Sequence, residues 1–260
     1  MQYFFPYIHT SAPRLWRGVF CWIWVIGFCG QSLAQGPQRS PYPWQAKQDL
    51  PILTGIGLTL GSSLWLSRAV EPLTPAELGA LDRNQVLRFD RGIIGQWWPG
   101  AAKVSDVLLL GSLALPFGLN LFGEVRPHWK EHLLMTQEVL FLTYGLTNLA
   151  KVLTLRPRPF TYLNDPAVEE LQMGADARYS FFSGHTSMSA AGCWYSATVF
   201  QQLYPDSPAR HWVWAGAALI PAATGYLRVR SNKHFPTDVL VGYVIGAAVG
   251  TLIPRLKFRK

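Results

Sequence analysis

Charged side chains are scarce in this sequence: they make up 15% of its 260 residues, whereas 49% are hydrophobic. This balance is unusually apolar for a soluble domain of this size. The apolar residues also fall in blocks of about 17–22 residues, the length that spans a bilayer, and not at the spacing of a soluble core. The scarcity of charge therefore predicts a membrane protein.

Cysteine is almost absent. Cys21 and Cys29 lie in the first apolar block and Cys193 lies in a later one, so no disulfide framework and no metal-binding spacing can be read from them. The sequence also has no internal repeat and no low-complexity tract. The cysteine pattern therefore predicts neither a metal site nor a disulfide-stapled fold.

A nucleic-acid-binding pattern is missing too, although the formal net charge is +8. The basic residues lie mostly between apolar blocks and at the C-terminus, without a basic helix or interleaved aromatic and basic residues. Positive charge beside membrane-spanning segments explains this distribution. The expected partner is the membrane, and no nucleic-acid partner is predicted.

Residues 1–34 have the features of a targeting segment. An apolar run over residues 19–29 follows two arginines, and residues 32–34 (Ser-Leu-Ala) supply small residues at both positions that a signal peptidase reads. This pattern resembles a secretory signal peptide cleaved before Gln35, and an uncleaved N-terminal membrane anchor is the alternative. Residues 35–50 are predicted to be a linker.

Six further apolar blocks are long enough to be predicted as membrane-spanning helices. We therefore expect residues 51–260 to form one domain, an all-α polytopic membrane helix bundle of about six transmembrane helices. The predicted spans are residues 51–67, 104–122, 132–151, 184–203, 212–228 and 238–255.

Residues 71–102, between the first two spans, are not apolar enough to cross the membrane. Thr74-Pro75-Ala76-Glu77 has the pattern of a helix start with Pro at the first position. This segment is predicted to form a short amphipathic layer on the membrane surface.

The last predicted span carries a stripe of glycines. Gly242, Gly246 and Gly250 recur every fourth residue on the same face as Asp238. In lipid, such a stripe lets two helix backbones approach closely, so we interpret it as a helix-packing feature.

Polar residues are costly at membrane depth, yet three clusters of them lie at the ends of predicted spans. The first closes the third span, the second opens the fourth, and the third joins the fifth to the sixth. They are residues 151–159, 183–185 and 228–238. Only a loop joins spans three and four, and one more pair of crossings returns the chain to that side, so all three clusters are expected on one face of the membrane.

Together the clusters predict a binding site for an anion. Lys151, Arg158 and Arg228 supply positive charge. The helix start at Gly184 and His185 supplies backbone N–H groups, and two histidines are available for proton transfer.

Spacing within the clusters adds detail. His234 and Asp238 are four residues apart, so the carboxylate is expected to accept a hydrogen bond from one imidazole nitrogen and leave the other free to attack. Pro157 and Pro159 prevent the preceding helix from continuing through Arg158, whose guanidinium is then aimed at phosphate from an extended chain.

Each of these residues has a simpler explanation when it is taken alone. Basic side chains near span ends usually snorkel to the membrane surface, and a Ser-Gly pair or an Asp at a helix start usually caps the helix. A single interfacial histidine is usually structural. The combination of these residue types, in this order, at three span ends on one face is what indicates a functional site.

The three clusters resemble the motifs of the type 2 phosphatidic acid phosphatase (PAP2) superfamily, which shares its site with vanadium haloperoxidases and glucose-6-phosphatase. The first motif, Lys-x6-Arg-Pro, matches residues 151–159. The second, Pro-Ser-Gly-His, matches residues 182–185, with Phe182 in place of Pro. The third, Ser-Arg-x5-His-x3-Asp, matches residues 227–238, with Leu227 in place of Ser. The resemblance covers roughly residues 51–255 and rests on three spaced motifs, which is a specific signal.

The resemblance implies a mechanism and a set of site residues. His234 would attack phosphorus to form a phosphohistidine, with Asp238 orienting its ring, and His185 would protonate the leaving oxygen. Neither a metal nor another cofactor is implied. The phosphoryl oxygens would be held by Lys151, Arg158, Ser183, Gly184 and Arg228.

The predicted function is hydrolysis of a lipid phosphate or diphosphate in the bilayer. Undecaprenyl diphosphate, phosphatidylglycerol phosphate, phosphatidate and a lipid A phosphate all remain open as substrates. The alternatives are a catalytically inactive lipid-phosphate-binding membrane protein and a vanadate-dependent haloperoxidase-like enzyme. Retention of His185, His234 and Asp238 speaks against the first, and six apolar spans speak against the second.

Four basic residues at the C-terminus predict the orientation of the bundle: Arg255, Lys257, Arg259 and Lys260. Such charge is retained in the cytoplasm, so the expected location is a bacterial inner membrane with the site facing the periplasm. A cleaved signal peptide would leave Gln35 outside, whereas six crossings require residue 50 inside. Either the block 51–67 enters the membrane without crossing, or residues 14–34 are not processed.

Overall fold

The structure is a computed structural model that describes residues 40–95 and 97–259. The predicted signal peptide or anchor at residues 1–34 lies outside the described residues. Within the described part, every regular element is a helix, as expected for an all-α fold.

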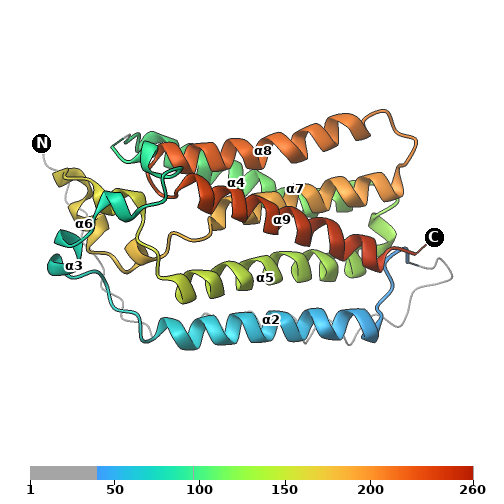
Figure 1. Ribbon diagram of the computed structural model, residues 1–260. Coiled ribbons are helices and arrows are strands. Elements are labelled where there is room, and N and C mark those ends of the chain that lie inside the picture. The colour runs from blue at the N-terminus through green and yellow to red at the C-terminus, as the bar shows by residue number, and fades with distance from the viewer. Residues whose placement is uncertain (1–39, 96, 260) are drawn as a thin grey trace, which may run out of the picture. The chain divides into compact units, whose positions relative to one another are not determined.

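Six long helices form the bundle and run side by side in Figure 1. Each of them overlaps one predicted span, and most extend beyond it by a few residues because backbone hydrogen bonding continues past the last apolar side chain. They are α2 (Ala46–Ser67), α4 (Gly100–Gly118, continued by the 3-10 turn Leu119–Leu121), α5 (Trp129–Thr154), α7 (Gly184–Leu203), α8 (Arg210–Arg230) and α9 (Pro236–Lys257). The first helix thus begins within the predicted linker.

Three of these helices are both long and apolar enough to cross a membrane, as judged by length and composition: α2, α4 with its 3-10 turn, and α9. The other three carry more polar residues. In α7, for example, Ser187, Ser189, Ser196 and Thr198 are all buried inside the bundle, where they lower the hydropathy of the helix without facing lipid.

Helix α7 is the central helix, because it packs against α4, α5, α8 and α9. Its hydroxyl groups pair with those of its neighbours: Ser189 Oγ lies 2.7 Å from Ser112 Oγ of α4, and Ser187 Oγ lies 2.9 Å from Thr147 Oγ1 of α5. Such pairs satisfy polar groups between helices in lipid. By contrast, α2 packs mainly against α5.

The glycine stripe of α9 faces α7 at very short range, as predicted. A Cβ atom on Gly242 would lie 2.7 Å from the carbonyl oxygen of Ser183. On Gly246 it would lie 2.0 Å from that of Ser187, and on Gly250 it would lie 2.5 Å from that of Ala191. Real Cβ atoms do not approach this closely, so only glycine permits this packing.

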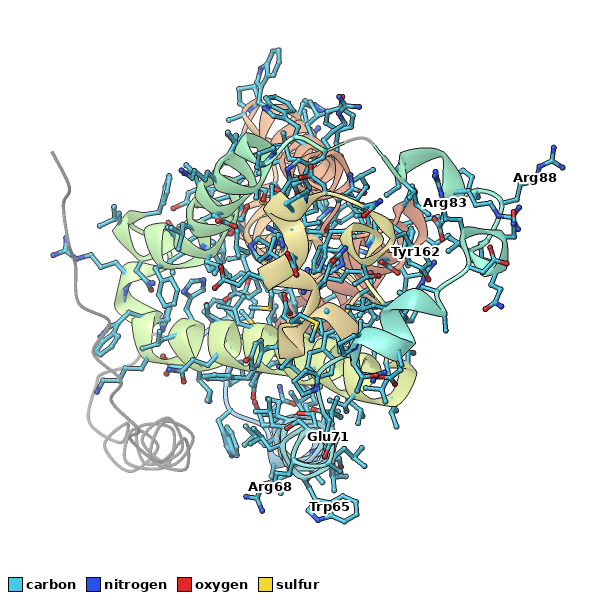
Figure 2. All side chains as sticks on the ribbon, turned by 90° about the vertical axis from the view of Figure 1, so that its left-hand side faces the viewer. Trp65, Arg68, Glu71, Arg83, Arg88 and Tyr162 are labelled. Atoms are coloured by element: carbon cyan, nitrogen blue, oxygen red, sulfur yellow. The ribbon has the colours of Figure 1, made fainter. Side chains whose placement is uncertain are left out.

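Short helices cover one end of the bundle, where α3 (Pro75–Gly79) and α6 (Glu169–Gln172) lie in Figure 1. Helix α3 starts with the predicted cap, since Thr74 and Glu77 form a capping box. Arg178 donates to the Glu77 carboxylate at 2.6 Å and to the Glu71 carbonyl at 2.9 Å, which joins segments 71–99 and 155–183. We call the described residues of segment 71–99 the surface layer. Seen from this end, Arg88 of the layer points outward from the bundle (Figure 2).

The opposite end of the bundle holds a buried ion cluster. Lys257 of α9 donates to Asp49 of α2 and, at 2.6 Å, to Glu138 of α5, and all three side chains are at most 1% exposed. A buried ammonium needs such partners because an unpaired charge is very costly away from water. Lys257, one of the four basic residues used to predict the orientation, therefore joins three helices.

Candidate active site

The first cluster leaves helix α5 as the flanking prolines predict. Leu155, which ends the helix, has a φ of 45°, and Arg158 has extended backbone angles of −76° and 156°. The guanidinium of Arg158 donates to the backbone oxygen and carboxylate of Asp176, at 3.0 and 2.6 Å, and to the Lys233 carbonyl at 3.1 Å. Three of its five N–H donors are used in this way, which leaves one donor on each terminal nitrogen for an anion.

The second cluster forms the start of α7. Ser183 is the N-cap, and its own N–H donates to the carbonyl oxygen of Asp238 at 3.0 Å, which joins the second cluster to the third. The Nζ atom of Lys151 lies 3.5 Å from the point where a Cβ on Gly184 would stand. The ammonium therefore lies beside the first free N–H groups of the helix, in the arrangement that favours an anion. Phe182, at the usual Pro position, is buried directly before this cap.

His185 meets a residue that the sequence did not indicate. Its Nε2 atom lies 2.8 Å from Oδ1 of Asp106 on α4, and Arg228 approaches the same oxygen at 3.5 Å. Asp106 thus connects the proposed acid to one of the proposed phosphate ligands. A lone Asp inside a predicted apolar span was the signal that could have found it, because ionisable residues at membrane depth are usually functional.

His234 is held by a backbone group. Its Nδ1 atom lies 2.7 Å from the carbonyl oxygen of Ser180 and 3.8 Å from Oδ2 of Asp238. The expected direct hydrogen bond from the ring to Asp238 is therefore replaced by one from the ring to a main-chain oxygen. Because a carbonyl only accepts, Nδ1 carries the proton and Nε2 carries the lone pair.

Burial, together with the surrounding positive charges, favours a neutral ring at His234. Burial lowers the pKa of His234 well below its usual value, and the positive charges of Arg158, Arg228 and Lys151 lower it further. The three proposed phosphate-binding cations thus all disfavour a positive charge on the ring. A neutral imidazole is the form that can attack as a nucleophile.

Asp238 forms hydrogen bonds with residues around the His234 ring and not with the ring itself. Its Oδ2 atom accepts hydrogen bonds from the Ser180 hydroxyl at 2.5 Å and from the Phe235 N–H at 2.9 Å. Its Oδ1 atom accepts from Arg156 at 2.5 Å, and Arg156 also donates to Asp90 at 2.7 Å. No pattern in the sequence connects Asp90 to this site, since it comes from the surface layer and has no local motif.

Lys233 is a further cation beside this site. Burial lowers its pKa, with smaller contributions from the positive charges of Arg158 and Arg228. In the described part of the chain, no group of three His, Cys, Asp or Glu side chains is arranged to hold a metal ion.

These features define a helical membrane protein with a cationic site built around two histidines. The family model described as the PAP2 superfamily matches residues 133–260, a range that contains all the predicted site residues. This part of the chain is thus similar to the PAP2 superfamily.

Two known proteins show how far the similarity extends. Phospholipid phosphatase 2 of Bos taurus is 32% identical over 139 residues, which are 44% of this chain and 46% of that protein. The chain thus spans about half the length of this curated relative. A crystal structure described as the first transmembrane PAP2 type phosphatidylglycerolphosphate phosphatase from Bacillus subtilis is 22% identical. The match between the two structures covers 80% of this chain and 95% of the Bacillus subtilis chain, with a TM-score of 0.45.

Proposed function

We propose that this protein is a membrane phosphatase that removes phosphate from a lipid phosphate or diphosphate through a phosphohistidine intermediate. The observation that carries the proposal is the state of His234. Its Nδ1–H is held by the Ser180 carbonyl, and its Nε2 is left as a nucleophile among Lys151, Arg158 and Arg228.

In the first step, the Nε2 lone pair of His234 attacks phosphorus and an N–P bond forms. The bond between phosphorus and the lipid oxygen breaks, and His185 gives its proton to that oxygen, so the lipid leaves as an alcohol or a lower phosphate. The cations Lys151, Arg158 and Arg228 hold the phosphoryl oxygens as negative charge redistributes over them.

In the second step, water attacks the phosphohistidine. His185, now neutral, takes a proton from the water as its oxygen bonds to phosphorus. The N–P bond breaks and its electron pair returns to Nε2 of His234. Inorganic phosphate leaves, and both histidines are back in their starting protonation states.

A phospholipid substrate class agrees with the name of the bovine relative, and the four candidate lipids all present phosphate at the headgroup level. The site lies at the end of the bundle that the surface layer covers, so it is positioned for such a headgroup. The proposed location is a bacterial inner membrane with this end in the periplasm.

The structure bears on the conflict between signal peptide and topology. Helix α2 has 22 residues and enough hydropathy to cross, which corresponds to about 33 Å of helix. The explanation in which residues 51–67 enter the membrane without crossing it is therefore less simple than one in which they cross. We therefore favour the alternative in which residues 14–34, which lie outside the described residues, are not processed.

A phosphate-release panel tests the function. The purified full chain is assayed in detergent micelles with undecaprenyl diphosphate, phosphatidylglycerol phosphate, phosphatidate and a lipid A phosphate, each compared with the His234→Ala variant. Release by the wild type alone supports the proposal. Binding of these lipids without release would instead indicate the inactive lipid-binding alternative, and vanadate-dependent halide oxidation would indicate the haloperoxidase alternative.

A further inference from the structure

Asp90 is the most deeply buried acidic residue of the surface layer, although the layer itself is largely exposed. Its side chain has no exposed area, whereas Leu87 and Phe89 beside it are 60% and 71% exposed. The chain thus turns one carboxylate inward, toward the three clusters. A buried carboxylate is costly unless it is fully paired, so its partners indicate what it does.

The partners of Asp90 are the start of α9 and Arg156. Its Oδ1 atom accepts from the Thr237 N–H at 3.0 Å, and its Oδ2 atom accepts from the Thr237 hydroxyl at 2.6 Å. Arg156 donates to Oδ2 at 2.7 Å. Asp90 therefore caps the helix that begins two residues after His234, in place of a local cap residue.

Arg156 extends this contact to the nucleophile. One of its terminal nitrogens binds Asp90, and the other binds Asp238 at 2.5 Å. The guanidinium also stacks over the Phe235 ring, with its central carbon 4.3 Å from the ring centroid. A planar group that bridges two carboxylates fixes both in direction, which a lysine ammonium does less well.

The last links run from Asp238 to the ring. Asp238 accepts the Ser180 hydroxyl at 2.5 Å, and the carbonyl of the same Ser180 accepts Nδ1–H of His234 at 2.7 Å. The chain of contacts is therefore Asp90, Arg156, Asp238, Ser180 and His234. Its first member comes from the surface layer, outside the region that the family model matches.

We propose that Asp90 and Arg156 are positioning residues that hold the imidazole of His234 in line with the phosphorus atom, through Asp238 and Ser180. This inference rests on the proposed function. It makes the surface layer a part of the catalytic apparatus, since the layer supplies the carboxylate on which the arrangement depends. In this proposal, neither Asp90 nor Arg156 contacts the substrate.

The experiment compares Asp90→Asn with Asp82→Asn in the full-length protein. Asp82 is a matched control because it lies in the same layer, is exposed, and caps only the neighbouring Asn84 N–H. The readouts are kcat, KM and inhibition by orthovanadate and by inorganic phosphate. Vanadate resembles the five-coordinate transition state and so reports on the attacking ring, whereas phosphate reports on the cations alone.

For Asp90→Asn we expect kcat to fall by roughly 10²-fold, as misplaced reacting groups do, and vanadate inhibition to weaken by a similar factor. KM and phosphate inhibition should change little, and Asp82→Asn should behave as wild type. Arg156→Lys should retain more activity than Arg156→Gln. The double variant Asp90→Asn/Arg156→Gln should be no worse than its poorer single variant, because both substitutions break one chain of contacts.

Three results would overturn the inference in distinguishable ways. If the wild type releases phosphate but Asp90→Asn keeps full kcat and full vanadate sensitivity, the positioning role is wrong and the proposed function stands. If Asp90→Asn weakens vanadate and phosphate inhibition equally, its role is general stability of the site. If the wild type releases no phosphate from any lipid, the proposed function fails and the inference fails with it.

Discussion

The carbonyl oxygen of Ser180 lies 2.7 Å from Nδ1 of His234, closer than the Asp238 carboxylate at 3.8 Å. The ring is therefore oriented by main chain, which cannot be protonated or removed by substitution. Asp238 acts one step away, by holding the Ser180 hydroxyl and Arg156. This arrangement fixes the tautomer of His234 whatever the charge on Asp238.

The pH dependence should reflect the lowered pKa of His234. A group with a lowered pKa stays neutral until the pH falls through that lower value, so attack should persist well below pH 6.5, the ordinary histidine pKa. The measurement is kcat/KM for an aryl phosphate, corrected for the substrate's own second ionisation. An acid limb centred at or above the ordinary value would contradict the prediction.

The nucleophile and its supporting carboxylate should differ in effect. We expect His234→Ala to abolish phosphate release, because the proposed nucleophile is removed. Asp238→Asn should lower release by roughly 10²-fold, because the Ser180 segment that orients the ring loses its support. His211→Ala is a suitable control because His211 is exposed at the start of α8, far along the helix from Arg228. A fully active His234→Ala enzyme would end the nucleophile assignment.

His185 should matter most for poor leaving groups. Substrates with basic leaving oxygens need a proton, so His185→Ala should slow lipid phosphates far more than an aryl phosphate. Asp106→Asn should show the same selectivity to a smaller degree, because Asp106 lies 2.8 Å from the Nε2 atom of His185. Equal losses with both substrates would argue against an acid role.

Divalent metal should not be required. Lys151, Arg158 and Arg228 already supply the positive charge that a metal would bring to the phosphoryl oxygens. Turnover of the purified protein in excess EDTA should therefore match that without chelator. Loss of most activity, restored by added Mg²⁺ or Zn²⁺, would refute this prediction.

The sidedness can be tested with single cysteines in a background without native cysteine. Asp165 and Arg259 are exposed and lie toward opposite ends of the bundle, whereas Lys257 is buried and unsuitable. An impermeant maleimide added to intact cells should label position 165 and spare position 259. The reverse pattern would make the site cytoplasmic.

The sequence predicted the helices well because apolar length is a direct consequence of membrane thickness. It predicted that the three clusters would share one face, because crossings alternate sides. It did not predict that Lys257 would be buried, because a basic residue after an apolar span looks the same whether it faces water or pairs with Asp49 and Glu138.

The contacts of the site that were missed are those made over long sequence separations. Asp90 reaches Thr237 across 147 positions, and Asp106 reaches His185 across 79. A single carboxylate belongs to no repeating pattern or spaced motif in the sequence. Its partner is therefore seen only once the helices and the surface layer are packed together. The assumed contact between His234 and Asp238 was wrong in detail because helical spacing does not account for a competing carbonyl group.

The glycine contacts between α9 and α7 have a consequence for how substrate can enter. His185 lies in the first turn of α7, and His234 lies two residues before the start of α9. Backbone rests on backbone at Gly242, Gly246 and Gly250, with no side chain between them to change rotamer. We therefore expect the two helices to behave as one rigid body, with the same distance between the proposed acid and the proposed nucleophile for every substrate. Any opening that admits a headgroup must come from the surface layer or from the helices around this pair.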